Sequence, residues 1–121
     1  MTLTLDHYQR LNLAVLLGML ECRNVNETRA AWRLMDRLAL DDGESRTIEL
    51  QVQNINGAEI FSWNHARTLP AREYDLTDGE LQQIERALSG GRLQPGPMRR
   101  WLEPLLAQMP ELKETNGHNR Q

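Results

Sequence analysis

Two helical patterns occupy the first forty residues. Apolar side chains recur three or four positions apart from Tyr8 to Met19, which is the spacing that lines one face of a helix. Thr4 has the side chain of an N-cap residue, so we expect the first helix to begin there and to end near Leu20. Additional leucines widen its apolar stripe, and we therefore expect this helix to be the most buried of the chain.

The second helical pattern follows a short break. Asn26 is a predicted N-cap. The apolar positions after it keep the i, i+3, i+4, i+7 spacing of a buried helix face: Ala31, Leu34, Met35 and Leu38. The acidic, glycine-containing residues 41–44 then predict a loop that ends this helix.

The pattern next changes from helical to alternating. Apolar and polar residues alternate over 48–53, as in a strand with one face in water. Asn56-Gly57 predicts a two-residue type I′ turn, because that turn requires positive φ at both central positions. Such a turn places Ile55 and Ile60 on one face and fixes three pairs on the other: Val52 with Phe61, Leu50 with Trp63, and Ile48 with His65.

The last third of the chain predicts a short strand and two helices. The strand covers 72–76, with Tyr74 and Leu76 facing inward. Thr77 and Glu80 have the spacing of a capping box at the start of a helix, which Gly90-Gly91 ends. A final helix opens at 95–97, kinks or restarts at Pro104, and ends at Pro110.

These elements predict an α+β domain over residues 1–110. It contains two N-terminal helices, a central antiparallel β-hairpin or three-strand meander, and two C-terminal helices. The polar, glycine-containing residues 111–121 predict a disordered C-terminal tail.

Length and composition limit the number of domains, the cellular location and the kinds of site that we expect. With 121 residues there is room for one domain, and the longest apolar stretch is about half of the ~20 residues needed to cross a bilayer. Without a visible signal peptide, we expect a cytoplasmic protein with no membrane contact. Cys22 is the only cysteine, so no disulfide within the chain and no cysteine-based zinc site can form.

The sequence does not predict an enzyme. His7, His65 and His118 lie in separate segments, and we expect His7, in the first helical turn, to be exposed. Cys22 has no designated base, no phosphate-binding glycine loop is present, and the acidic residues 41–44 miss the spacing of a calcium loop. We therefore predict no metal and no cofactor. Catalysis would require a pocket that converges on His7, His65 or Cys22.

Binding residues are easier to nominate. Arg29, Arg33 and Arg37 stand at i, i+4 and i+8 on the second helix, opposite its apolar stripe. This basic ridge is either a solvated helix face or a surface for phosphates or acidic protein. Trp32, beside Arg29, has the composition of an interface hot spot or else covers the edge of the core.

Two other tryptophans and a second basic spot complete the candidates. Trp63 and Trp101 fall on predicted core faces, and Arg99 and Arg100 stand next to Trp101. Thirteen of the fourteen basic residues are arginine, which either reflects a GC-rich genome or favours bidentate recognition.

We accordingly expect a non-catalytic accessory protein that binds another protein as an adaptor or inhibitor, with a homodimer as one form. The binding residues are then Arg29, Trp32, Arg33 and Arg37. The alternative is a nucleic-acid-binding regulator that uses the same arginine face, although the net charge of −3 opposes it.

The order of the motifs also resembles a group of small proteins of unknown function encoded by phages and mobile elements. The shared features are a Leu3-Thr4 helix start, a leucine-rich helix, a second helix with Arg and Leu, a Trp63-Asn64 strand end, an acidic short strand and a closing helix pair. The resemblance covers residues 3–109. It implies an accessory phage-type protein and carries over no site residue.

Overall fold

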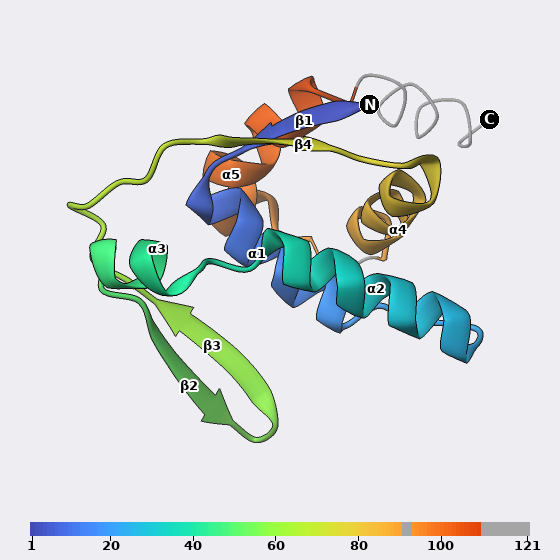
Figure 1. Ribbon diagram of the computed structural model, residues 1–121, viewed down its shortest axis with the longest axis horizontal. Coiled ribbons are helices and arrows are strands. Elements are labelled where there is room, and N and C mark those ends of the chain that lie inside the picture. The colour runs from blue at the N-terminus through green and yellow to red at the C-terminus, as the bar shows by residue number, and fades with distance from the viewer. Residues whose placement is uncertain (91–92, 110–121) are drawn as a thin grey trace.

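The computed structural model describes residues 1–90 and 93–109, in which five helices combine with two separate pairs of antiparallel strands (Figure 1). The fold class is therefore α+β, as predicted. In chain order the elements are β1 (Thr2–Leu5), α1 (His7–Gly18), α2 (Val25–Leu38), α3 (Asp42–Thr47), β2 (Gln51–Ile55), β3 (Ala58–Ser62), β4 (Arg72–Asp75), α4 (Asp78–Leu88) and α5 (Pro95–Ala107). The predicted tail at 111–121, Pro110 and Gly91 lie outside the described residues.

The N-terminus forms a strand, so the prediction that Thr4 caps the first helix is wrong. Leu3 and Leu5 are fully buried while Thr2 and Thr4 face outward, which is a period of two rather than a helix start. β1 pairs antiparallel with β4, and Leu3 stands opposite Tyr74. Asp6 begins α1 instead, because its side chain accepts from the Gln9 amide and the Gln9 side chain accepts from the Asp6 amide in return.

The beginnings of the next two helices also differ from prediction. Asn24, not Asn26, caps α2 by accepting from the amide of Glu27. The acidic segment predicted to be a loop forms α3, whose start has a complete capping box of Asp41 and Glu44. The carboxylates of Asp42 and Glu44 in its first turn also interact favourably with the helix dipole, which further explains why this segment is helical.

The hairpin turn and its register are confirmed. Val52 pairs with Phe61, and the turn residues Asn56 and Gly57 have φ values of 54° and 82°. The predicted strand start is wrong, because Ile48 is the buried C-cap of α3 and Glu49 has a φ of 56° that interrupts any strand at 48–50. The two outer pairs predicted from this register, Leu50 with Trp63 and Ile48 with His65, therefore do not form, and the ladder ends at Gln51 opposite Ser62.

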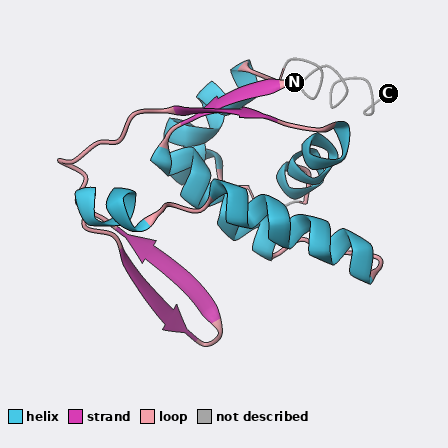
Figure 2. Cartoon of the chain, in the orientation of Figure 1, coloured by secondary structure: helices cyan, strands magenta, loops and turns pink. Residues whose placement is uncertain are grey.

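The three-strand meander is also wrong. β4 begins close to where it was predicted, but it pairs with β1, and the β2–β3 hairpin projects away from the helical body (Figure 2). The pairing differs because residues 2–5 form the strand β1, which the sequence pattern does not predict. Its four residues need a partner, and Arg72–Asp75 supplies one from seventy positions away.

The C-terminal helices agree better with the sequence. The capping box of Thr77 and Glu80 starts α4 as predicted. α5 runs as one helix through Pro104, so the alternative of a helix restarting at that residue is wrong. Trp101 is buried as expected, and its own backbone carbonyl accepts from the Gln9 side chain at 3.2 Å. α1 contacts α2, α4, α5 and β1, which confirms its central position.

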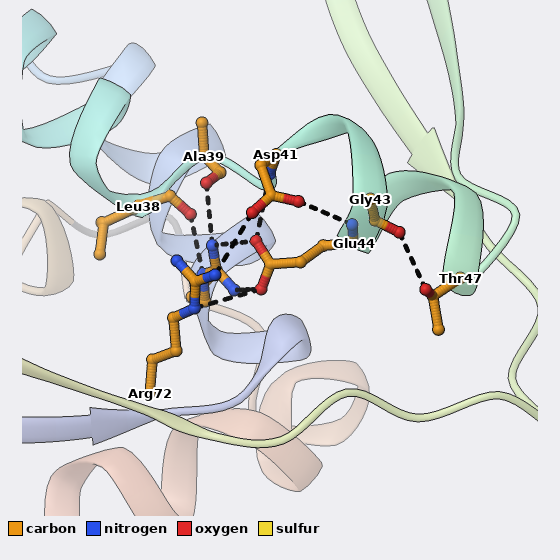
Figure 3. A network of polar contacts seen from close by, with 8 residues as sticks. Leu38, Ala39, Asp41, Gly43, Glu44, Thr47 and Arg72 are labelled. Carbon is orange, nitrogen blue, oxygen red and sulfur yellow. Dashed lines mark hydrogen bonds and ion pairs between the residues drawn. The ribbon is translucent and has the colours of Figure 1, made fainter.

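A buried ionic network joins α1 to the end of α2 and to α3, the short helix that precedes the hairpin. Arg10 is 1% exposed and donates to the carbonyls of Leu38 and Ala39 at 3.0 and 2.8 Å, at the C-terminus of α2. Its guanidinium also forms two bonds to the Glu44 carboxylate, at 2.6 and 3.0 Å. Arg72 of β4 approaches the same carboxylate at 3.4 Å (Figure 3). The network therefore fixes α3 against both α1 and β4.

This network makes stability depend on pH. The hydrogen bonds from Arg10 lower the pKa of Glu44 to about 2. The carboxylate stabilises the fold fully above its unfolded pKa near 4.5, and we expect this stabilisation, about 3 kcal/mol, to disappear as the pH falls from 4.5 towards 2. Urea unfolding at several pH values measures this change in the free energy of unfolding.

Replacement of the carboxylate tests the same assignment. Glu44→Gln should lower the free energy of unfolding by about 3–5 kcal/mol at pH 7, and the free energy of unfolding of the variant should then fall less between pH 4.5 and pH 2. If the free energy of unfolding fell equally with pH in the original chain and in Glu44→Gln, Glu44 would not be the group responsible.

Candidate functional site

The four predicted binding residues all lie on α2 and are all exposed, with Trp32 58% exposed. They do not share one face. At 3.6 residues per turn the positions of Arg29, Arg33 and Arg37 advance around the helix by about 40° per step, while Trp32 stands on the other side of Arg29. Trp32 and Arg37 are therefore roughly 140° apart around α2. The proposed ridge and the proposed hot spot belong to different surfaces.

Arg37 is engaged within the protein. It donates to both carboxylate oxygens of Glu80 at 2.7 and 2.6 Å and to the Asp75 carbonyl at 3.2 Å. Burial raises the pKa of Glu80, but the bonds from Arg37 and from the Thr77 amide outweigh it and hold that pKa below its usual value. Arg37 therefore joins α2 to α4 instead of extending the basic ridge.

A polar hollow of about 590 Å³ lies between α2 and α4 and contains Arg33 and Arg37. Its third arginine, Arg86, lies 3.5 Å from the Glu27 carboxylate. Glu80 and Glu27 thus compensate two of its three positive charges. Within residues 1–90 and 93–109, Arg29 and Arg33 have no ion-pair partner, so they are what remains of the ridge.

An apolar groove of about 530 Å³ lies on the other side of α2, bounded by the C-terminal part of α1, by α2 and by the hairpin tip. Trp32 stands at this groove together with Met35, and Met19 is 42% exposed beside them. The lining is mainly apolar and sulfur-containing, and its principal side chains are Val15, Leu20, Cys22, Ala31 and Phe61. Cys22 is half-buried here, and the described residues that line the groove include no histidine.

The hairpin exposes apolar side chains on both faces. Val52 shares one face with Phe61, and Ile55 and Ile60 share the other, as the turn predicted. Their exposed fractions are 50% for Val52, 49% for Ile55 and 47% for Ile60. No other strand of the described residues pairs with either edge of this hairpin. An isolated two-stranded hairpin is only marginally stable in water. Apolar side chains that remain uncovered on such a hairpin therefore indicate a surface that contacts another molecule.

The histidine prediction needs correction. His7 is 6% exposed, not exposed as expected, because the loop after β3 folds over the start of α1. His7, Tyr8, Trp63 and His65 form one cluster, in which the Tyr8 and Trp63 rings meet edge to face at 4.8 Å. Trp63 is only half-buried in this cluster and does not enter the main core.

The comparisons give no relative. No protein-family model, curated protein or solved structure matches the chain. Residues 1–90 and 93–109 contain no helix long and apolar enough to cross a membrane, and no cluster of His, Cys, Asp and Glu able to hold a metal. The resemblance to phage-type proteins therefore stays a prediction.

Stability measurements distinguish Trp32 as a surface residue from Trp32 as part of the core. Because more than half of its side chain is exposed, we expect Trp32→Ala to change the free energy of unfolding by less than about 1 kcal/mol. The buried Trp101→Ala is the matched control and should cost about 3–5 kcal/mol. Urea unfolding followed by circular dichroism measures both. A loss at Trp32 as large as that at Trp101 would assign Trp32 to the core.

Proposed function

We propose that this chain is a non-catalytic accessory protein that binds another protein through the apolar groove and the projecting hairpin. The observation that carries the proposal is the uncovered apolar surface shared by these two features. Seven large hydrophobic side chains of the described residues are exposed, and five of them belong to these two features: Met19 and Trp32 at the groove, Val52 on the hairpin face that carries Phe61, and Ile55 and Ile60 on the opposite face of the hairpin.

The energetics favour a protein partner. Burial of each large apolar side chain contributes about 1.5–3 kcal/mol relative to exposure, and half-exposed side chains still have part of that gain available. Trp32 is suited to an anchor because a half-exposed tryptophan beside an apolar groove can bury a large area at low entropic cost.

The chemistry of the partner follows from the surroundings of the groove. An extended apolar segment can pair with a free hairpin edge and insert side chains beside Trp32, as in β-strand addition. Arg29 is the arginine of α2 nearest to Trp32 around the helix, about 60° away, and it has no ion-pair partner among the described residues, so an acidic group flanking that segment would be favoured. A second copy of the chain, pairing hairpin to hairpin, is one form of this binding.

The proposal includes the adaptor or inhibitor role, the phage-type context and the cytoplasmic setting that the sequence predicts. Composition and the resemblance described above support these parts. The structure supports only the apolar groove and the hairpin as a binding surface.

The nucleic-acid alternative has weaker support. The pairing of Arg37 with Glu80 reduces the ridge to two arginines, and Glu27 compensates Arg86 in the neighbouring hollow. Together with a net charge of −3, this leaves little of the continuous positive face that phosphate binding requires.

Photo-crosslinking from the groove tests the proposal. A photoreactive phenylalanine analogue at Glu59, which is exposed and lines the groove, should crosslink a protein in cells. Trp32→Ala and Ile60→Ser should each reduce the yield at least about fivefold, because each removes apolar contact area. Arg99→Ala is the control, since Arg99 is exposed on α5 and pairs only with Glu103 among the described residues.

The outcomes separate the alternatives. A product of twice the chain mass identifies the homodimer, and a different mass identifies a separate partner. Yields that both variants leave unchanged would contradict binding at this surface. A product that disappears after nuclease treatment would support the nucleic-acid alternative.

A further inference from the structure

A third hollow, separate from the proposed protein-binding surface and from the hollow between α2 and α4, lies where the start of α1 meets the loop after β3 and the middle of α5. It has a volume of about 220 Å³. Three segments far apart in sequence line it: Asp6, His7 and Tyr8; His65, Arg67, Thr68 and Leu69; and Arg100. Both histidines that the sequence left in separate segments therefore line one pocket.

Aromatic contacts hold the walls of this pocket. Trp63 stacks on His65 with ring centroids 5.0 Å apart and meets Tyr8 edge to face. The Tyr8 hydroxyl is hydrogen-bonded to Nδ1 of His65. When this hydroxyl donates, a neutral His65 carries its proton on Nε2, which leaves that nitrogen as a donor.

The pocket carries an excess of positive charge. The Arg100 guanidinium lies 4.5 Å from the Tyr8 ring centroid, a cation–π contact that fixes its plane and leaves its N–H edge able to donate. Within the described residues Arg100 forms no ion pair, whereas its neighbour Arg99 pairs with Glu103. Arg67 approaches Glu49 at 3.2 Å, but both side chains are more than half exposed, and such exposed pairs are weak.

Negative charge in the pocket is limited to Asp6. One of its carboxylate oxygens already accepts from the Gln9 amide as the N-cap of α1. His7 and Tyr8 occupy the first turn of that helix, where backbone N–H groups have no intrahelical partner and the helix dipole is positive. The local field therefore favours an anion.

His7 forms a buried part of the pocket wall. It is 6% exposed and lines the pocket, and its Nδ1 atom has no hydrogen-bond partner in the described part of the chain. The indole N–H of Trp63, in contact with the same cluster, is also buried without a partner. Burial lowers the pKa of His7, so the ring is neutral near pH 7 and can donate from one nitrogen and accept at the other. Both atoms are inaccessible to solvent in this structure, so a ligand bound in the pocket would change their surroundings without contacting them directly.

We propose that this pocket binds the phosphate group of a small molecule, held by Arg100 and Arg67 and by donors from His65 and the first turn of α1. Planar arginine edges match phosphate oxygens in bidentate geometry, and a helix start favours a dianion over a monoanion. The pocket accommodates a phosphate group with a small substituent, and the shared chemistry is that of inorganic phosphate and phosphate monoesters.

NMR titration of the full chain tests the proposal. Inorganic phosphate, glycerol phosphate and chloride are added separately at equal ionic strength and pH 7, and the Trp63 indole N–H and the His7 and His65 ring signals are followed. We expect saturable shifts with the two phosphates and none with chloride. Tighter binding of inorganic phosphate assigns the site to the free ion, and tighter binding of glycerol phosphate assigns it to a monoester.

Two exposed variants form a matched pair. Arg100→Gln should weaken phosphate binding about tenfold by removing a charged, bidentate donor, whereas Arg99→Gln should leave it unchanged. Both replace an exposed side chain on the same turn of α5, so both should fold. Equal shifts with chloride and phosphate, or equal weakening by the two variants, would overturn the proposal. Neither result would affect the proposed protein binding, which uses a different surface.

Discussion

The burial of Arg10 constrains most of the structure. A guanidinium that is 1% exposed must have nearly all of its donors bonded, because an unpaired buried charge is far more costly than an unpaired amide. Arg10 meets this requirement with two carbonyls at the end of α2 and the carboxylate of Glu44. The chain leaving α2 must therefore turn back across α1, and α3 must form where Glu44 can reach inward. The direction of the hairpin follows, since it begins directly after α3.

Local chemistry explains which parts of the fold could be predicted from the sequence. The Asn56-Gly57 turn and the capping box at Thr77 each depend on residues within five positions, and both are present as expected. The errors concern distant partners. Thr2–Leu5 has too few residues to be recognised as a strand until Arg72–Asp75 is seen beside it, and the helical character of residues 42–47 depends on Asp41 and on the Arg10 network.

For the candidate sites, too, the sequence predicts local features but not contacts between residues far apart in the chain. Exposure of Trp32 on α2 follows from helical phase, and so does the spacing of the three arginines. That Arg37 is paired could not be inferred, because Glu80 is forty-three positions away on another helix. The burial of His7 was missed for a similar reason: it depends on where residues 63–69 cross the start of α1. The predicted register did place Ile55 and Ile60 on the face opposite to Val52, although the alternation over 48–53 indicated that one face of the strand is in water.

The pairing of β1 with β4 has a consequence for the order of events during synthesis. Leu3 and Leu5 are made well before their strand partners at 72–75, and the Gln108 side chain that bonds to Thr4 is made later still. Domains mature at the rate of translation, about 5–20 residues per second. The N-terminal segment thus waits for several seconds as an unpaired apolar stretch while the local hairpin forms ahead of it. The end of the last described helix thus bonds to a strand that is made before every other element described here.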